Sequence, residues 1–254
     1  MAQAKAETGH AEGVSIDPEE IAKFTAMAAE WWDPDGKFRP LHKFNPTRLA
    51  YIRDRVAAHL DRDPLGDGPL AGLKLLDIGC GGGLLAEPLT RLGARVTGID
   101  AAARNVKIAS LHAEEAGLRI DYRQATAEQL AEQGERFDVV LNMEVVEHVA
   151  NVQAFLSASG ALVKPGGLMI LATLNRTPKA FLLAIVGAEY LLGWLPRGTH
   201  DWRRFLRPSE VAGFLRAAGL EVTEIAGVVY NPLTDAWRLS RDTGVNYMIL
   251  AAKD

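Results

Sequence analysis

The sequence predicts an α/β fold: a mostly parallel, seven-stranded sheet with helices on both faces. Two observations support this prediction: short apolar runs recur from residue 72 onward, and helical patterns fall between most of them. Such alternation is typical of βαβ units with right-handed crossovers. The expected strands are 73–78, 95–99, 120–123, 137–141, 168–174, 220–229 and 245–251.

A helical extension is expected before the sheet. Asp17 can cap a first helix, with Pro18 at its first position and Glu20 closing a capping box. A second helix is expected to start at residues 45–46, and the turn-rich segment 63–69 separates the extension from the sheet. The predicted organisation is a disordered tail (1–13), the helical extension (14–62), and the α/β domain (70–254) with an apolar insertion (177–201).

The composition of the chain limits which partners it can bind and where in the cell it is expected. The net charge of −4 gives no overall footprint for nucleic acid, so none is expected as a partner. Cys80 is the single cysteine, which excludes an intramolecular disulfide and suits a reducing, cytoplasmic compartment. The first 13 residues lack the basic start and apolar core of a signal peptide. No apolar run reaches the roughly 20 residues of a membrane span, so a soluble or at most peripheral protein is expected.

The glycine-rich loop after the first expected strand predicts a nucleoside-containing cofactor. A dinucleotide fingerprint starting at Gly79 and Gly81 would need a third glycine where Leu84 stands. Asp77, at the end of that strand, would repel a pyrophosphate but could pair with an ammonium group. Asp100, at the end of the second strand, can accept hydrogen bonds from both ribose hydroxyls. Each residue alone could serve only a turn or a helix cap. Together they favour S-adenosylmethionine and disfavour an NAD-linked oxidoreductase.

Further motifs lie on both sides of the glycine loop. They are 20–24 (EIAKF), 31–33 (WWD), 40–42 (PLH), 45–48 (NPTR), 76–83 (LDIGCGGG), 143–149 (MEVVEHV), 173–176 (TLNR), 186–190 (VGAEY), 198–201 (GTHD), 230–232 (YNP) and 245–248 (VNYM). With them the chain resembles class I S-adenosylmethionine-dependent methyltransferases, which have a Rossmann-like fold, and more closely the ubiquinone-biosynthesis O-methyltransferase family. This resemblance implies methylation of a catechol hydroxyl on polyprenylated ubiquinone precursors, at both O-methylation steps, and a possible place in a ubiquinone-biosynthesis complex.

The resemblance also assigns cofactor contacts. Arg48 makes physical sense there, because a guanidinium can grip the methionine carboxylate through two parallel hydrogen bonds. Met143, at the end of the fourth expected strand, could pack against adenine, although a buried methionine is more often core. The expected cofactor-binding residues are Arg48, Asp77, Gly79, Gly81, Asp100 and Met143.

Three residues form a candidate metal site. Glu144, Glu147 and His148 stand at i, i+3 and i+4, so a helical turn would put them on one face. The resemblance implies that they bind Mg²⁺, although the histidine would also suit zinc or manganese. The alternative to a metal site is a purely structural role, in which the carboxylates cap the start of a helix and are favoured by its dipole. Glu144 and His148 are the expected catalytic residues. A bound ion would lower the phenol pKa of the catechol. Without an ion, His148 could act as general base, but the same lone pair of His148 cannot bind a metal ion and accept a proton at once. The role of His148 as a metal ligand is favoured.

The segment 180–195 is strongly apolar and carries one charge. It is too short to span a bilayer but long enough for an interfacial helix, with Lys179 and Arg197 beside it to attract anionic headgroups. We therefore expect peripheral binding to an anionic membrane, on its inner face; a buried lid helix is nearly as favoured.

Two rival functions stay open: a non-catalytic methyltransferase-like subunit that binds lipid or cofactor, and a methyltransferase of another small catechol.

Overall fold

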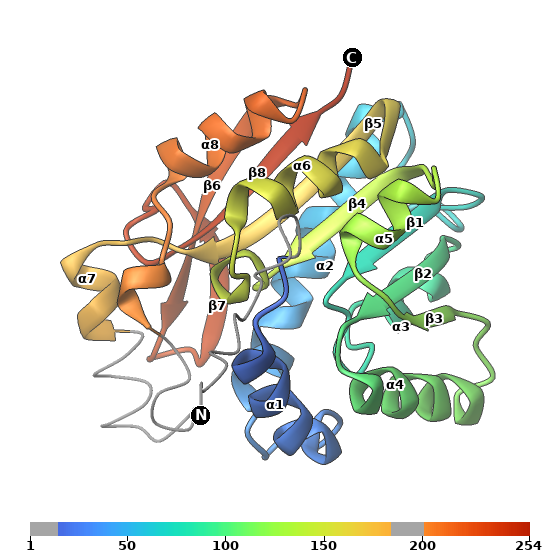
Figure 1. Cartoon of the computed structure of the whole chain (residues 1–254), viewed down its shortest axis with the longest axis horizontal. Coiled ribbons are helices and arrows are strands. Elements are labelled where there is room, and N and C mark those ends of the chain that lie inside the picture. Colours follow the sequence, from blue (N-terminus) through green and yellow to red (C-terminus); the bar gives the residue numbers. More distant parts are fainter. Residues whose placement is uncertain (1–14, 184–200) are drawn as a thin grey trace, which may run out of the picture.

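The protein, seen in a computed structural model that describes residues 15–183 and 201–254, has one eight-stranded sheet in the order β3-β2-β1-β4-β5-β8-β6-β7 (Figure 1). The strands are β1 (Lys74–Ile78), β2 (Arg95–Asp100), β3 (Asp121–Gln124), β4 (Phe137–Met143), β5 (Val163–Leu174), β6 (Glu221–Asn231), β7 (Ala236–Ser240) and β8 (Asn246–Ala252). The first five pair in parallel, and β6, β7 and β8 join the sheet in antiparallel register. The predicted fold class is confirmed. The predicted tail 1–13 and most of the predicted insertion 177–201 lie outside the described residues.

The prediction of seven strands is short by one, because β7 was missed. This strand is largely exposed and shows no apolar alternation. Its place in the sheet comes from its antiparallel ladder with β6, in which Tyr230 stands opposite Trp237. Edge strands of this kind depend on a partner far along the fold, and their own sequence gives little signal.

Helices cover both faces of the sheet. They are α1 (Pro18–Met27), α2 (Arg39–His59), α3 (Ala86–Arg91), α4 (Ala103–Glu115), α5 (Ala127–Glu132), α6 (Val152–Leu162), α7 (Pro178–Ala180) and α8 (Pro208–Ala217), with short 3₁₀ turns at Ala28–Glu30, Val146–His148 and Trp202–Arg204. Leu75 belongs to the core under α2 and α3, whereas its neighbour Leu76 belongs to the core under α5, α6 and α8. These two sets of helices lie on opposite faces of the sheet (Figure 1). This alternation is the period-two pattern of a sheet buried on both sides.

Helix α2 begins at Arg39, so the predicted start at residues 45–46 is wrong. Pro40 occupies its first turn, where a missing N–H costs nothing, and Pro46 lies inside the helix. An interior proline costs roughly 3 kcal/mol. Helix α2 also buries Phe44, Ile52 and Val56, each almost fully, and burial of such side chains contributes roughly 1.5–3 kcal/mol apiece, which outweighs the proline.

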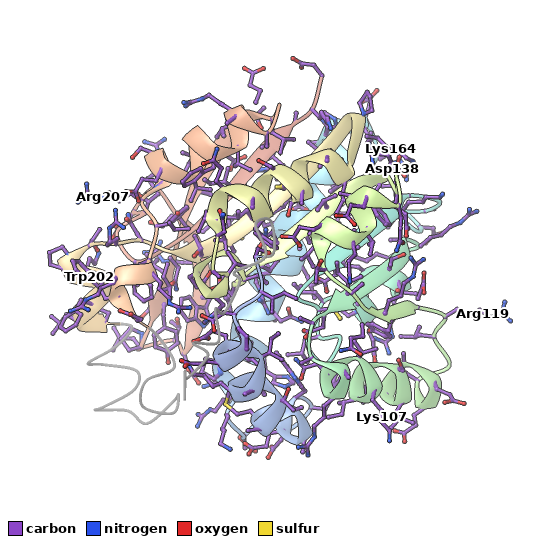
Figure 2. The ribbon with its side chains drawn as sticks, viewed as in Figure 1. Lys107, Arg119, Asp138, Lys164, Trp202 and Arg207 are labelled. Carbon is purple, nitrogen blue, oxygen red and sulfur yellow. The ribbon has the colours of Figure 1, made fainter. Side chains whose placement is uncertain are left out.

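An ion pair lies at the amino ends of β4 and β5. Lys164 donates to Asp138 over 2.6 Å, and both lie on the side of the molecule away from Trp202 (Figure 2). In the part of the chain that the structure describes, no helix combines the length and the apolar character of a membrane span.

Candidate active site

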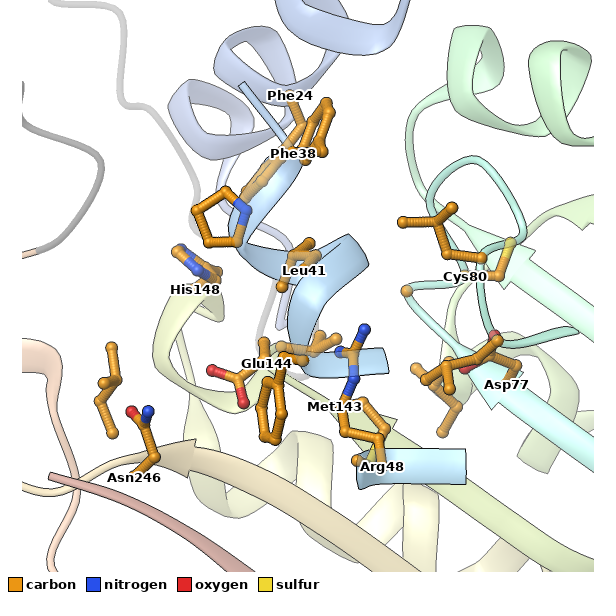
Figure 3. Close-up of a pocket in the computed structure, with 18 of the residues that line it drawn as sticks. Phe24, Phe38, Leu41, Arg48, Asp77, Cys80, Met143, Glu144, His148 and Asn246 are labelled. Carbon is orange, nitrogen blue, oxygen red and sulfur yellow. The ribbon is translucent and has the colours of Figure 1, made fainter. Parts of the chain in front are cut away.

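A chamber of about 960 Å³ lies at the carboxyl ends of β1, β2 and β4. Open α/β sheets bind their ligands at this edge. The strand ends supply Asp77, Asp100 and Met143, and helices α1 and α2 close the opposite side (Figure 3). All six predicted cofactor residues belong to this chamber or to the loop beneath it. The chamber is lined by Arg48, Asp77, Gly79, Asp100 and Met143, and Gly81 lies in the loop.

The glycine loop is shaped by left-handed backbone at Gly79 and Gly81, whose φ angles are 69° and 53°. A Cβ on Gly79 would lie 2.5 Å from Val145, so the position has no room for a side chain. The Asp100 carboxylate accepts the Gly81 N–H at 3.0 Å and the Ala102 N–H at 2.8 Å. Burial raises the pKa of Asp100, and these two N–H groups oppose the rise. Asp100 is thereby fixed at the tip of β2, facing the chamber.

Asp77 and Arg48 are buried residues of opposite charge that line the same chamber. Each is only 3% exposed. Desolvation raises the pKa of Asp77 to about 7; Arg48 opposes this rise and Asp100 adds to it. Desolvation likewise lowers the pKa of Arg48, against the attraction of Glu144 and Asp77. Figure 3 shows Arg48 and Asp77 directed toward the same space as Glu144. An ammonium group and a carboxylate would each find an opposite charge here.

The Arg48 guanidinium is held in place but not fully hydrogen-bonded. Its Nη2 donates to Asn45 at 3.0 Å, and the Asn45 amide donates to the carbonyl of Leu84 at 2.7 Å. The guanidinium also lies over the Phe44 ring, 5.0 Å from its centroid. Among the described residues its buried Nε has no hydrogen-bond partner. A buried donor without a partner is costly, so this site is prepared for an anionic ligand group.

The predicted helical turn over Glu144, Glu147 and His148 is wrong. Glu144 has left-handed backbone with φ of 61°, and only Val146–His148 forms a single 3₁₀ turn. Glu147 is buried and accepts the Thr173 hydroxyl at 2.8 Å. Desolvation and the neighbouring Glu144 raise its pKa well above the usual range. The three side chains therefore do not share one helical face.

These side chains do not fit the expected metal site as it stands. Glu144 and His148 line the chamber, whereas Glu147 does not. Over residues 15–183 and 201–254, no three His, Cys, Asp or Glu side chains are arranged to hold a metal ion. One carboxylate oxygen of Glu147 accepts from Thr173, and Nδ1 of His148 is hydrogen-bonded to Glu20.

His148 is oriented by α1. Its Nδ1 lies 2.8 Å from a carboxylate oxygen of Glu20, and its ring meets Phe24 edge-on with centroids 5.1 Å apart. The hydrogen bond from His148 lowers the pKa of Glu20 to about 2, against its partial burial. An ionised Glu20 can only accept, so Nδ1 carries the hydrogen, and Nε2 is the nitrogen that can gain or lose a proton. Both side chains line the chamber.

Glu20 is the site residue that the sequence interpretation misassigned. Asp17 caps α1 as predicted, accepting from the N–H groups of Glu19 and Glu20. The predicted capping box is wrong, because the Glu20 side chain pairs with His148 and Lys23. The apolar wall of the chamber was also missed. It comes from the start of α2 and from the β6–β7 hairpin, through Leu41, Phe44, Val228, Tyr230 and Trp237. The motifs at 40–42 and 230–232 contained part of this signal but suggested no role.

A doubly covered sheet, a glycine loop after β1 and acidic residues at the ends of β1 and β2 define a class I S-adenosylmethionine-dependent methyltransferase. Residues 41–225 match the family model described as a methyltransferase domain. The chain is 62% identical over 239 residues to the ubiquinone biosynthesis O-methyltransferase of Parvibaculum lavamentivorans, covering 94% of each chain. It is 61% identical over the same length to that of Chelativorans sp., again covering 94% of each. The chain belongs to the family of ubiquinone biosynthesis O-methyltransferases.

Solved structures agree on the fold. Magnesium protoporphyrin IX methyltransferase from Synechocystis, determined with SAH bound, superposes with a TM-score of 0.62 at 21% identity, over 92% of this chain and 95% of that one. An S-adenosylmethionine-dependent methyltransferase from Clostridium acetobutylicum gives a TM-score of 0.60 at 12% identity, over 91% and 98%. At these identities the likeness concerns the architecture alone.

Proposed function

We propose that the protein transfers the methyl group of S-adenosylmethionine to a catechol hydroxyl of polyprenylated ubiquinone precursors, at both O-methylation steps. As a member of its family it is an S-adenosylmethionine-dependent O-methyltransferase of ubiquinone biosynthesis. The observation that supports the finer proposal is one chamber that combines the Asp77–Arg48 pair, the Asp100 carboxylate, the Glu20–His148 pair and an apolar wall.

Different residues of the chain bind different parts of the cofactor. Arg48 takes the methionine carboxylate, and its Nε has no other partner among the described residues. Asp77 takes the ammonium group, which would hold this carboxyl ionised despite its burial. Asp100 accepts the ribose hydroxyls, and Met143 packs against adenine. Gly79 and Gly81 let the loop backbone approach the ligand.

His148 is the general base of the proposed reaction. When bound, S-adenosylmethionine supplies an electrophilic methyl group on a positively charged sulfur. His148 Nε2 takes the proton of the catechol hydroxyl while that oxygen forms its bond to the methyl carbon and the carbon–sulfur electron pair stays with sulfur. Glu20 stabilises the resulting imidazolium through Nδ1. Glu144, beside them in the chamber, is placed to hold the second catechol hydroxyl.

The family resemblance implies a Mg²⁺ requirement, but the mechanism proposed here does not include one. The arrangement of Glu144, Glu147 and His148 does not offer three converging ligands, so no step of this mechanism passes through a metal ion. Here the chain's own residues position the two reactants and accept the proton.

The apolar wall suits a prenylated ring. Phe44 and Trp237 lie 4.9 Å apart between ring centroids, and Tyr230 lies 5.4 Å from Trp237. These aromatic side chains come from α2 and the β6–β7 hairpin, and they line the chamber. They would bury the ring and the first part of the tail without competing for hydrogen bonds.

We further propose a cytoplasmic protein that binds the inner face of an anionic membrane through 180–195. Within the described part of that segment, Phe181, Leu182 and Leu183 are 46%, 59% and 51% exposed, and Leu183 also lines the chamber. A tail could then stay in lipid while its ring enters. The protein should pellet with anionic liposomes, whereas Leu183→Glu with Leu192→Glu should stay in the supernatant yet bind S-adenosylmethionine. If the wild-type protein stays in the supernatant at low salt, where electrostatic attraction is strongest, the proposed membrane binding is wrong. A place in a biosynthetic complex stays a prediction.

A methyl-transfer assay tests the proposed function. The substrate is a short-tailed catechol, with two controls: the same ring lacking one hydroxyl, and an untailed catechol. We expect adenosylhomocysteine and a monomethylated product from the tailed catechol, and weaker turnover of the untailed one. Equal turnover of both catechols would favour a methyltransferase of another small catechol, and binding without product would favour the non-catalytic subunit.

A further inference from the structure

The segment after α1 packs directly on the cofactor loop. Trp31 is 8% exposed and stacks on Phe38, with ring centroids 3.7 Å apart and planes 8° apart. A Cβ on Gly81 would come within 2.4 Å of the Trp31 indole, and a Cβ on Gly82 within 2.4 Å of the Trp31 Cβ. Glycines at these two positions are thus required by a tryptophan of the N-terminal extension, independently of any ligand.

The Trp31 indole also makes one specific polar contact. Its Nε1–H donates to the side-chain oxygen of Asn105 at 3.0 Å. Asn105 lies in the first turn of α4 and is 2% exposed. Because its oxygen accepts from Trp31, its amide N–H₂ is the group it can offer to a third residue. Asn105 and Asp100 line the same chamber, and the Asn105 side chain opposes the rise that burial causes in the pKa of Asp100. Gly81, on which Trp31 packs, also donates its N–H to the Asp100 carboxylate at 3.0 Å.

We propose that Trp31 is a positioning residue for the cofactor. The relay Trp31–Asn105–Asp100 orients the carboxylate that receives the ribose hydroxyls, so that the N-terminal extension is a working part of the cofactor site. The relay joins positions 31, 105 and 100, which come from the end of the 3₁₀ turn Ala28–Glu30, from α4 and from β2. This inference rests on the proposed function, because it takes Asp100 as the ribose acceptor.

A second set of contacts holds the segment in place without the relay. Trp32 Nε1–H donates to the carbonyl of Gly82 at 2.9 Å. Its ring stacks on His112, with centroids 3.5 Å apart and planes 3° apart, and His112 is tied to the buried Glu87. Loss of the Trp31 N–H alone should therefore leave the segment where it is. The variant Trp31→Phe removes this donor while keeping an aromatic ring against Phe38.

The test is calorimetry with adenosylhomocysteine on the full chain. Trp31→Phe should raise Kd about three- to tenfold, the usual effect of losing one hydrogen bond to a buried acceptor. The matched control is Trp202→Phe, which removes an indole donor bonded at 3.0 Å to the Thr177 carbonyl, on the side of the molecule away from Lys107 of α4 (Figure 2). Its Kd should equal that of wild type.

Two further measurements separate positioning from general loosening. In Asn105→Ala, adding Trp31→Phe should cause no further loss, because the relay is already broken. With an adenosylhomocysteine analogue that lacks the ribose hydroxyls, Trp31→Phe and wild type should bind equally. Asn105→Ala also keeps the relay testable if Trp31→Phe does not fold.

The outcomes distinguish the relay from the proposed function. Wild type that binds adenosylhomocysteine no more tightly than Trp31→Phe would overturn the relay alone. So would additive losses in the double variant, or an equal loss with the analogue. Wild type that fails to bind adenosylhomocysteine at all would overturn both the relay and the proposed function.

Discussion

Arg48→Lys is the substitution that most sharply examines the amino-acid end of the cofactor site. Lysine keeps the positive charge beside Asp77 and Glu144 but removes the planar fork that can meet a carboxylate with two hydrogen bonds. It also removes the bond from Nη2 to Asn45 and the contact with Phe44. Hydrogen bonds to charged groups contribute about 1.5–3 kcal/mol. Because Arg48 is 3% exposed, solvent does little to replace them.

The expected result is a Kd for adenosylhomocysteine that is about 10- to 150-fold higher in Arg48→Lys, from about 1.4 kcal/mol per tenfold change. Calorimetry measures it. The control ligand is 5′-methylthioadenosine, which has the nucleoside but no carboxylate, and its Kd should be the same in both proteins. An unchanged Kd for adenosylhomocysteine, or an equal loss for both ligands, would refute the assignment of Arg48 to the carboxylate.

Three other predictions concern the base, the buried carboxyl and the metal. His148→Ala should lower kcat by about 10²- to 10⁴-fold and leave the Kd of adenosylhomocysteine unchanged; a normal kcat would remove His148 as the base. Asp77 has a pKa of about 7 without ligand, and an ammonium partner lowers it, so binding releases a proton. Affinity should therefore fall by up to about tenfold per pH unit below 7 and be constant above it. Asp77→Asn should flatten this dependence, and a profile unchanged by that substitution would contradict it. Thorough chelation should leave the rate intact, whereas a rate that vanishes and returns with Mg²⁺ would contradict a metal-free mechanism.

Local signals in the sequence predicted much of the framework. The central parallel strands β1, β4 and β5 contain apolar runs because both of their faces are buried, as the opposed Leu75 and Leu76 show. Asp77 and Asp100 could be recognised because a carboxylate at the end of a parallel strand must face the edge where ligands bind. The Asp17 cap likewise depends only on its own helix.

The features that escaped prediction all depend on residues distant in sequence. Glu20 fits a capping box by spacing, but its actual partner His148 is 128 positions away. Trp31 and Asn105 are 74 positions apart. The i, i+3, i+4 spacing of Glu144, Glu147 and His148 suggested a helix, yet the chain turns through left-handed backbone at Glu144 instead. Spacing indicates a shared face only where the helix forms.

The most direct measurement is a crystal structure of the protein with adenosylhomocysteine and a short-tailed catechol. We predict ribose hydroxyls at hydrogen-bonding distance from Asp100, the carboxylate on Arg48, and a catechol oxygen between the sulfur and Nε2 of His148. The tail should lie along the wall formed by Phe44 and Trp237. Adenosylhomocysteine bound away from Asp100, or a catechol oxygen out of reach of His148, would contradict the proposed active site.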